Sequence, residues 1–116
     1  MSAKMNILKE LEKEMYLFNI GEHLESYRFL GSKQRTENGI EGWRFTVWAP
    51  HAKTVSLVGD FTGWKPVEMQ KIGKTGGWSH FTEVAAQGDC YKYYIEDKNG
   101  KKKYKIDPYS FAYEVP

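Results

Sequence analysis

The sequence predicts an all-β fold, an antiparallel β-sandwich or barrel, with a short helical segment before it. The period of the apolar residues changes from 3.6 to 2 at Trp43, which marks the passage from helix to strand. Beyond Trp43, about six short apolar runs follow one another with a turn roughly every ten residues, as in sandwiches and barrels. Strands and helices do not alternate there, which disfavours a parallel α/β sheet.

An amphipathic helix is predicted over residues 3–18. Its apolar residues recur at spacings of three, four and three and form one stripe, Leu8, Leu11, Met15 and Phe18. A second short helix is predicted over residues 22–30, because Leu24, Tyr27 and Leu30 fall on one side of it and Gly31 follows. Residues 32–42 are polar and contain glycine, so we interpret most of them as a loop or linker.

These assignments divide the chain into two parts. Residues 1–36 form a helical lead-in with its linker, and residues 37–116 form the β-module. We expect the lead-in to dock through its apolar stripe. We also expect it to contribute little to the stability of the β-module itself.

The β-module should contain six strands, over residues 43–48, 53–58, 67–72, 78–84, 90–97 and 101–106. Pro50 follows the first strand and ends it, since proline cannot donate a hydrogen bond to a strand ladder. Lys98, Asn99 and Gly100 form the strongest hairpin signal of the chain, so the last two strands should pair antiparallel.

The stretch over residues 55–64 is the centre of the predicted module. It begins as a strand and then breaks at Gly59 and again at Gly63, where glycine permits unusual backbone angles. Two large aromatics, Phe61 and Trp64, lie between and after these breaks. Trp64 either folds back over the end of the core or offers its flat ring to a ligand.

The bulk composition limits the function classes. The 116 residues suffice for one domain with its own core. A net charge of +2 gives too weak a field to indicate a nucleic-acid partner. No run of about 18 apolar residues predicts a membrane-spanning helix. Cys90 is the single cysteine, so no disulfide can form within the chain, which favours a reducing compartment such as the cytoplasm.

The sequence supports no catalytic centre, metal site or cofactor site. His23, His51 and His80 are scattered, and Cys90 has no second cysteine with which to share a metal. Three consecutive lysines over residues 101–103 could contact phosphates. Lysines beside a hairpin turn more often keep an edge strand solvated and unpaired, and we favour that interpretation.

An aromatic surface is the stronger functional signal. Alternation places Lys92 and Tyr94 on the outer face of their strand if Tyr91 and Tyr93 face the core. Sugars stack their C–H faces on aromatic rings, and Trp64, Tyr104 and Lys92 are suitable residue types for this. The residues alone leave a carbohydrate site and a protein interface equally open.

Several motifs resemble the amino-terminal carbohydrate-binding module, of the early-set or isoamylase type, of bacterial 1,4-α-glucan (glycogen) branching enzymes. They are GWRFTVWAP at 42–50, VSLVGDFTGW at 55–64, YKYYI at 91–95 and DPYSF at 107–111. The upstream YLFNIGEH at 16–23 and YRFLG at 27–31 resemble the lead-in of the bacterial enzymes. The resemblance covers nearly the whole chain except about the first fifteen residues.

This resemblance implies an immunoglobulin-like sandwich and an α-glucan ligand. In the related module of the AMP-activated kinase β subunit, sugar stacks on a tryptophan that corresponds to Trp64 and contacts a lysine that corresponds to Lys92. A second family tryptophan corresponds to Tyr104, a departure that weakens the expected platform. Thr62 occupies a position of the turn where asparagine is common.

The resemblance also implies a parent enzyme that cleaves an α-1,4 linkage and transfers the glucan segment to a 6-hydroxyl. The catalytic barrel of the parent would be the second partner of the module, beside the glucan chain. The 116 residues contain no barrel, so we expect them to be inactive alone. The alternative function is a structural spacer that packs on the barrel and binds no sugar.

Overall fold

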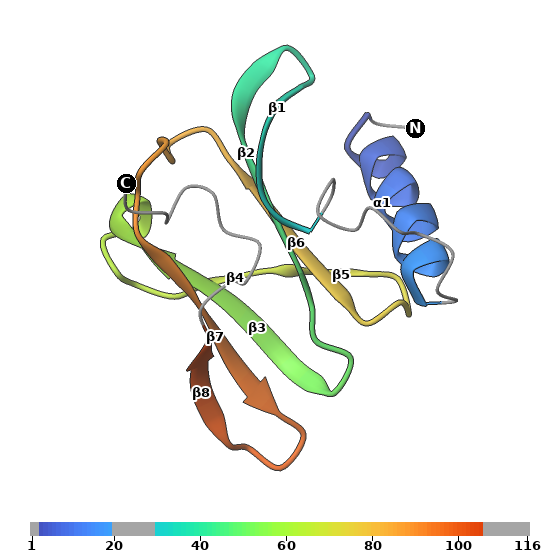
Figure 1. Ribbon diagram of the computed structural model, residues 1–116, viewed down its shortest axis with the longest axis vertical. Coiled ribbons are helices and arrows are strands. Elements are labelled where there is room, and N and C mark those ends of the chain that lie inside the picture. The colour runs from blue at the N-terminus through green and yellow to red at the C-terminus, as the bar shows by residue number, and fades with distance from the viewer. Residues whose placement is uncertain (1–2, 20–29, 106–116) are drawn as a thin grey trace.

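The computed structural model describes residues 3–19 and 30–105 and shows two four-stranded antiparallel sheets packed face to face (Figure 1). Sheet A has the order β1 (Gly31–Glu37), β2 (Ile40–Trp48), β6 (Gly77–Thr82) and β5 (Gln70–Ile72). Sheet B has the order β4 (Val67–Glu68), β3 (Ala52–Gly59), β7 (Tyr91–Asp97) and β8 (Lys102–Lys105). The predicted all-β sandwich with an N-terminal helix is confirmed.

The core lies between the two sheets and is rich in aromatic rings. Alternate residues of β3 and β7 point into it, and the register pairs Val55 with Ile95 and Leu57 with Tyr93. From sheet A, Phe45 meets Tyr91 edge to face, with their ring centroids 4.8 Å apart. Because these residues face the core, the alternate residues of β3 and β7 face away from it, on the outer side of sheet B.

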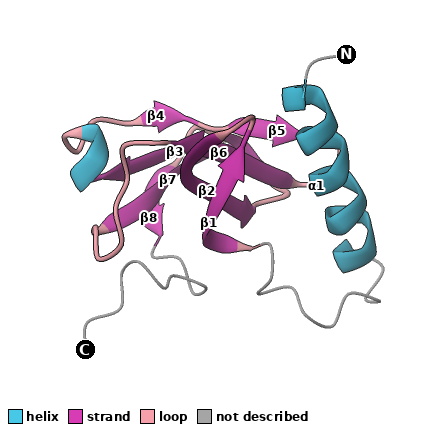
Figure 2. Ribbon diagram, turned by 90° about the horizontal axis from the view of Figure 1, so that it is seen from above, coloured by secondary structure: helices cyan, strands magenta, loops and turns pink. Residues whose placement is uncertain are grey.

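Helix α1 (Ala3–Asn19) covers the outer face of sheet A, so the molecule has three layers (Figure 2). Leu11 and Met15 of the predicted stripe are 2% and 0% exposed and pack against Leu30 and Ile72 in a second, smaller cluster. Phe18 and most of the predicted helix over 22–30 lie outside the residues whose side chains or backbone are described. Within 3–19 and 30–105, no helix has the length and apolar character that a membrane crossing requires.

A polar network lies on the outer face of sheet A, and it lines a hollow beside Ile7 of the helix. Arg44 makes a bidentate ion pair with Glu37, with its Nε and Nη2 atoms 2.6 and 2.7 Å from the carboxylate oxygens. Its Nη1 donates to Ser79 Oγ at 2.6 Å. Arg44 and Glu37 are each 6% exposed. Both faces of the central part of β2, residues 44–47, are therefore buried.

The loop or linker predicted over residues 32–42 is wrong for residues 32–37, which belong to strand β1, and for residues 40–42, which begin β2. The strand pairs with β2 along its full length, from Gly31 opposite Thr46 to Glu37 opposite Ile40. Asn38 and Gly39 make the turn with φ of 56° and 79°. Strand β1 is the outer strand of sheet A, so its polar composition suits partial exposure to water.

The single strand predicted over residues 67–72 is also wrong. It divides at Met69 into β4, which joins sheet B, and β5, which joins sheet A. Met69 is 3% exposed and donates its backbone N–H to the Val55 carbonyl at 2.8 Å. The buried methionine therefore fixes the point at which the chain passes from one sheet to the other.

The burial of Met15 reverses the expectation that the lead-in contributes little to stability. Met15→Ala should lower the free energy of unfolding by about 2–5 kcal/mol, as large-to-small changes in packed cores do. Urea unfolding followed by far-ultraviolet circular dichroism measures this. Tyr16→Ala, at the neighbouring 60% exposed position, is the matched control and should unfold almost like the parent chain. Equal midpoints for all three proteins would show that α1 is not part of the folded unit.

Candidate functional site

The outer face of sheet B carries a pair of tyrosine rings with a lysine beside them. Tyr94 of β7 lies opposite Tyr104 of β8 in the strand register, and their ring centroids are 4.8 Å apart at an angle of 36°. The Lys92 Nζ atom lies 5.9 Å from the centre of the Tyr104 ring. Tyr104 is 59% exposed. The result is an open aromatic surface with a cation at one end.

The strand register explains why these side chains gather there. Tyr91, Tyr93 and Ile95 of β7 point into the core, so alternation turns Lys92 and Tyr94 outward. The β7–β8 hairpin closes through the Asp97 N–H and the Lys101 carbonyl, 2.8 Å apart. Its register then sets the two tyrosines directly opposite each other.

Trp64 stands on the turn that follows β3. A 3₁₀ turn, η2 (Asp60–Thr62), ends at Gly63, and both Gly63 and Trp64 have left-handed backbones with φ of 66° and 62°. Such an angle is uncommon for a residue with a large side chain. Phe61 packs inward, with its ring stacked on Phe45 at 5.2 Å, while Trp64 remains 47% exposed. The structure thus gives Phe61 the role of covering the core.

A single carboxylate holds the Trp64 ring to the start of β7. Asp60 Oδ1 accepts a hydrogen bond from Trp64 Nε1 at 3.1 Å, and Asp60 Oδ2 accepts one from the Cys90 backbone N–H at 2.8 Å. The Asp60 N–H donates to the Cys90 carbonyl at 3.0 Å. Because Cys90 directly precedes β7, the indole is tied to the strand that carries Lys92.

The glycine and threonine of the turn have separate tasks. Gly59 is extended, and it is needed because a Cβ there would lie 2.7 Å from the Cys90 carbonyl oxygen. The Thr62 hydroxyl accepts from the Gly59 N–H and donates to the Gly59 carbonyl, each at 3.0 Å. Thr62, where the resembling modules commonly have asparagine, therefore closes this turn by its own side chain.

The structure unites two of the three residues that the sequence predicted for the site. Lys92 and Tyr104 are in contact, and Trp64 is linked to their strand indirectly through Asp60. The predicted set did not include Asp60 or Tyr94. The alternation along β7 already turned Tyr94 outward, whereas the place of Asp60 depends on a backbone contact with a residue 30 positions away.

This surface can stack against a flat apolar group and can donate hydrogen bonds. Flat rings suit the C–H faces of a sugar or another apolar surface, and the Lys92 ammonium and the tyrosine hydroxyls can bond to hydroxyl groups. Among the residues whose placement is described, no three His, Cys, Asp or Glu side chains gather in a way that could hold a metal ion.

Comparison with known families and curated proteins gives consistent matches. The sequence profile of carbohydrate-binding module 48, the isoamylase N-terminal domain, matches residues 29–110. The 1,4-alpha-glucan branching enzyme GlgB 1 of Clostridium perfringens (strain SM101 / Type A) is 45% identical over 107 residues, which is 90% of this chain and 16% of that enzyme. The GlgB of Francisella tularensis subsp. mediasiatica is 40% identical over 108 residues, again 90% of this chain and 17% of the enzyme.

Solved structures show the same fold. The catalytic module of the pneumococcal glycogen-degrading virulence factor SpuA aligns with a TM-score of 0.54 and 27% identity over 72% of this chain and 13% of that one. A mutant pullulanase of Paenibacillus barengoltzii, complexed with maltotetraose, aligns with a TM-score of 0.55 and 25% identity. That alignment covers 69% of this chain and 12% of the pullulanase. The chain thus spans about a sixth of the length of the curated relatives.

Proposed function

This chain belongs to the carbohydrate-binding module 48 family, and on that premise we propose that it binds α-1,4-glucan chains on Trp64, Lys92 and Tyr104. One observation carries the proposal, the paired rings of the half-buried Tyr94 and the exposed Tyr104 with the Lys92 ammonium beside them on the outer face of sheet B. The exposed Trp64 ring stands on the turn after β3 and is linked through Asp60 to the start of β7.

We propose further that the parent protein is a 1,4-α-glucan branching enzyme of glycogen synthesis in the cytoplasm. Support comes from the names of the relatives and from the share of their length that this chain covers. In that protein the module would hold or orient a glucan chain for the catalytic barrel. The 116 residues by themselves should form no α-1,6 branches on amylose.

Titration of the 116-residue chain with maltoheptaose by isothermal calorimetry tests glucan binding. We expect a dissociation constant of about 1 mM, which corresponds to about 4 kcal/mol, as one or two stacking contacts would provide. Cellohexaose, whose β-linked chain is straighter, is the control ligand and should bind more weakly. Absent binding of maltoheptaose would favour the structural spacer, and equal binding of the two sugars would contradict selection of the α-1,4 linkage.

Asp60→Ala should weaken maltoheptaose binding several-fold, because it removes the hydrogen bond that orients the Trp64 indole, worth about 1 kcal/mol. The intrinsic anisotropy of tryptophan fluorescence should fall in the same variant. Asp89→Ala is the matched control, because the Asp89 carboxylate accepts the Ala86 N–H at 2.8 Å within its own turn. Equal binding by both variants would show that Asp60 does not position the ring.

A further inference from the structure

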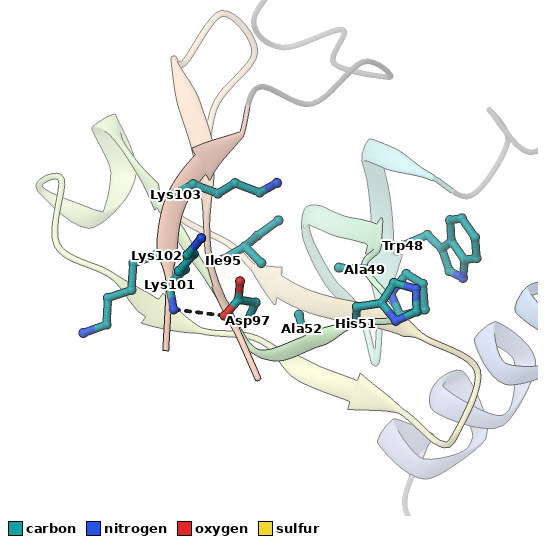
Figure 3. A pocket seen from close by; sticks show the side chains of 10 residues that line it. Trp48, Ala49, His51, Ala52, Ile95, Asp97, Lys101, Lys102 and Lys103 are labelled. Atoms are coloured by element: carbon teal, nitrogen blue, oxygen red, sulfur yellow. Dashed lines mark hydrogen bonds between the residues drawn. The ribbon is translucent and has the colours of Figure 1, made fainter. Parts of the chain in front are cut away.

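A hollow lies at the end of the sandwich that is opposite to Lys92 and Trp64. It has a volume of about 650 Å³ and opens between the β2–β3 loop and the β7–β8 hairpin (Figure 3). Ile95 and Asp97, near the end of β7, line it, whereas Lys92 lies at the start of the same strand. The hollow is therefore separate from the proposed glucan surface.

Its two walls differ in chemistry. Trp48, which is 41% exposed, and His51 form one wall, and Lys103 of β8 extends toward them from the other (Figure 3). The floor between the walls is apolar, with Ala52 and Ile95 each 7% exposed. A ligand held there would meet an indole, an apolar floor and an ammonium group at once.

The direction of Lys103 follows from the register of the hairpin. Lys103 lies opposite Ile95, whose side chain belongs to the core between the sheets. Side chains that are paired across a strand ladder share one face of the sheet. Lys103 therefore projects to the inner side of the edge strand, while Tyr104 projects outward. An inward lysine can serve merely to discourage edge pairing, and that role requires no ligand.

The charge around the hollow is positive. Three lysines, Lys101, Lys102 and Lys103, line it against one carboxylate, that of Asp97. Asp97 Oδ1 already accepts the backbone N–H groups of Asn99 and Lys101 at 2.8 and 2.9 Å. Excess ammonium groups favour an anion, and phosphate esters accept such charge-assisted hydrogen bonds strongly.

We propose that this hollow binds a phosphorylated hexose, with its phosphate on Lys103 and its sugar ring between Trp48 and the apolar floor. A neutral glucan would leave the ammonium groups without a charged partner. Inorganic phosphate would leave the indole and the floor unused. The volume lies within the range of about 300–1,000 Å³ that is usual for small-molecule sites.

Glucose 6-phosphate is the probe, added to the ¹⁵N-labelled 116-residue chain and followed by nuclear magnetic resonance. We expect shifts at the Trp48 indole N–H and around Lys103, with saturation at millimolar concentration. Glucose and inorganic phosphate should each bind about tenfold more weakly than glucose 6-phosphate. Glucose lacks the phosphate contact with Lys103, and inorganic phosphate lacks the ring contact with Trp48 and the floor. Inorganic phosphate that binds as tightly as glucose 6-phosphate, or glucose that does so, would overturn the proposal.

Two lysine variants sharpen the test. Lys103→Ala should weaken glucose 6-phosphate binding about tenfold, the value of one charge-assisted hydrogen bond. Lys102→Ala removes the same charge from the same hairpin, but alternation along β8 turns its side chain to the face opposite that of Lys103, so its effect should stay below about twofold by screening in water. Equal losses in the two variants would mean diffuse attraction and would refute a built site. Maltoheptaose binding should survive Lys103→Ala, so the two sites can fail independently.

Discussion

Trp64→Ala should abolish measurable maltoheptaose binding while the fold survives. The ring is 47% exposed and Phe61 already covers the core beneath the turn, so the exposed face of the indole is available to a ligand. One aromatic platform contributes about 1–3 kcal/mol when a flat group stacks on it. A module that binds at about 1 mM has only about 4 kcal/mol in total. Loss of the ring therefore moves the dissociation constant out of the measurable range.

Trp48→Ala is the matched control, because Trp48 is 41% exposed and lies at the other end of the sandwich. It should leave maltoheptaose binding unchanged. Tyr104→Ala should weaken binding less than Trp64→Ala, since Tyr94 remains and a tyrosine offers a smaller ring. Calorimetry and thermal melting of all three variants measure this. A Trp64→Ala protein that melts several degrees lower but binds like the parent would make the ring a part of the core.

Glu37→Ala should lower the free energy of unfolding by about 3–5 kcal/mol, because it leaves the buried Arg44 guanidinium without its carboxylate. This is a large part of the about 5–15 kcal/mol that a domain possesses. Urea unfolding measures it. Glu41→Ala removes an exposed carboxylate from the adjoining strand β2 and should change the midpoint little.

A double variant separates a lost ion pair from lost packing. Glu37→Leu combined with Arg44→Met replaces both charges by apolar side chains of similar volume, which is often neutral or stabilising. Ser79 would lose its hydrogen bond from Arg44 and keep its contact with Thr46 at 3.4 Å. We expect the double variant to regain most of the stability that Glu37→Ala loses. A double variant as unstable as the single one would show that the charges themselves hold strands β1, β2 and β6 together.

Much of the fold could be predicted from local patterns. The alternation along β7 and the Lys98–Gly100 turn depend on neighbours in sequence, and both were confirmed by the structure. The edge strand β1 was missed because its residues are polar, although Asn38-Gly39 is itself a hairpin signal. The family resemblance was confirmed by the profile match over residues 29–110.

What could not be predicted depends on contacts between distant residues. The apolar residues along one side of α1 predicted that the helix packs against another apolar surface. They did not indicate that this surface is the outer face of sheet A. The burial of Arg44 depends on partners from two other strands, Glu37 of β1 and Ser79 of β6. At the site, the hydrogen bond from Cys90 to Asp60 needs the ends of β3 and β7 side by side. The three predicted site residues remain proposals until binding is measured.

Chemical-shift mapping of maltoheptaose on the ¹⁵N-labelled 116-residue chain shows which residues the sugar contacts. We expect a shift of the Trp64 indole N–H as its hydrogen bond to Asp60 responds to the sugar, together with backbone shifts at Lys92 and Tyr104. The Trp48 indole, at the opposite end of the sandwich, should remain unshifted. Shifts confined to the Trp48 end, or no shifts at all at 10-fold excess over about 1 mM, would contradict glucan binding on the outer face of sheet B.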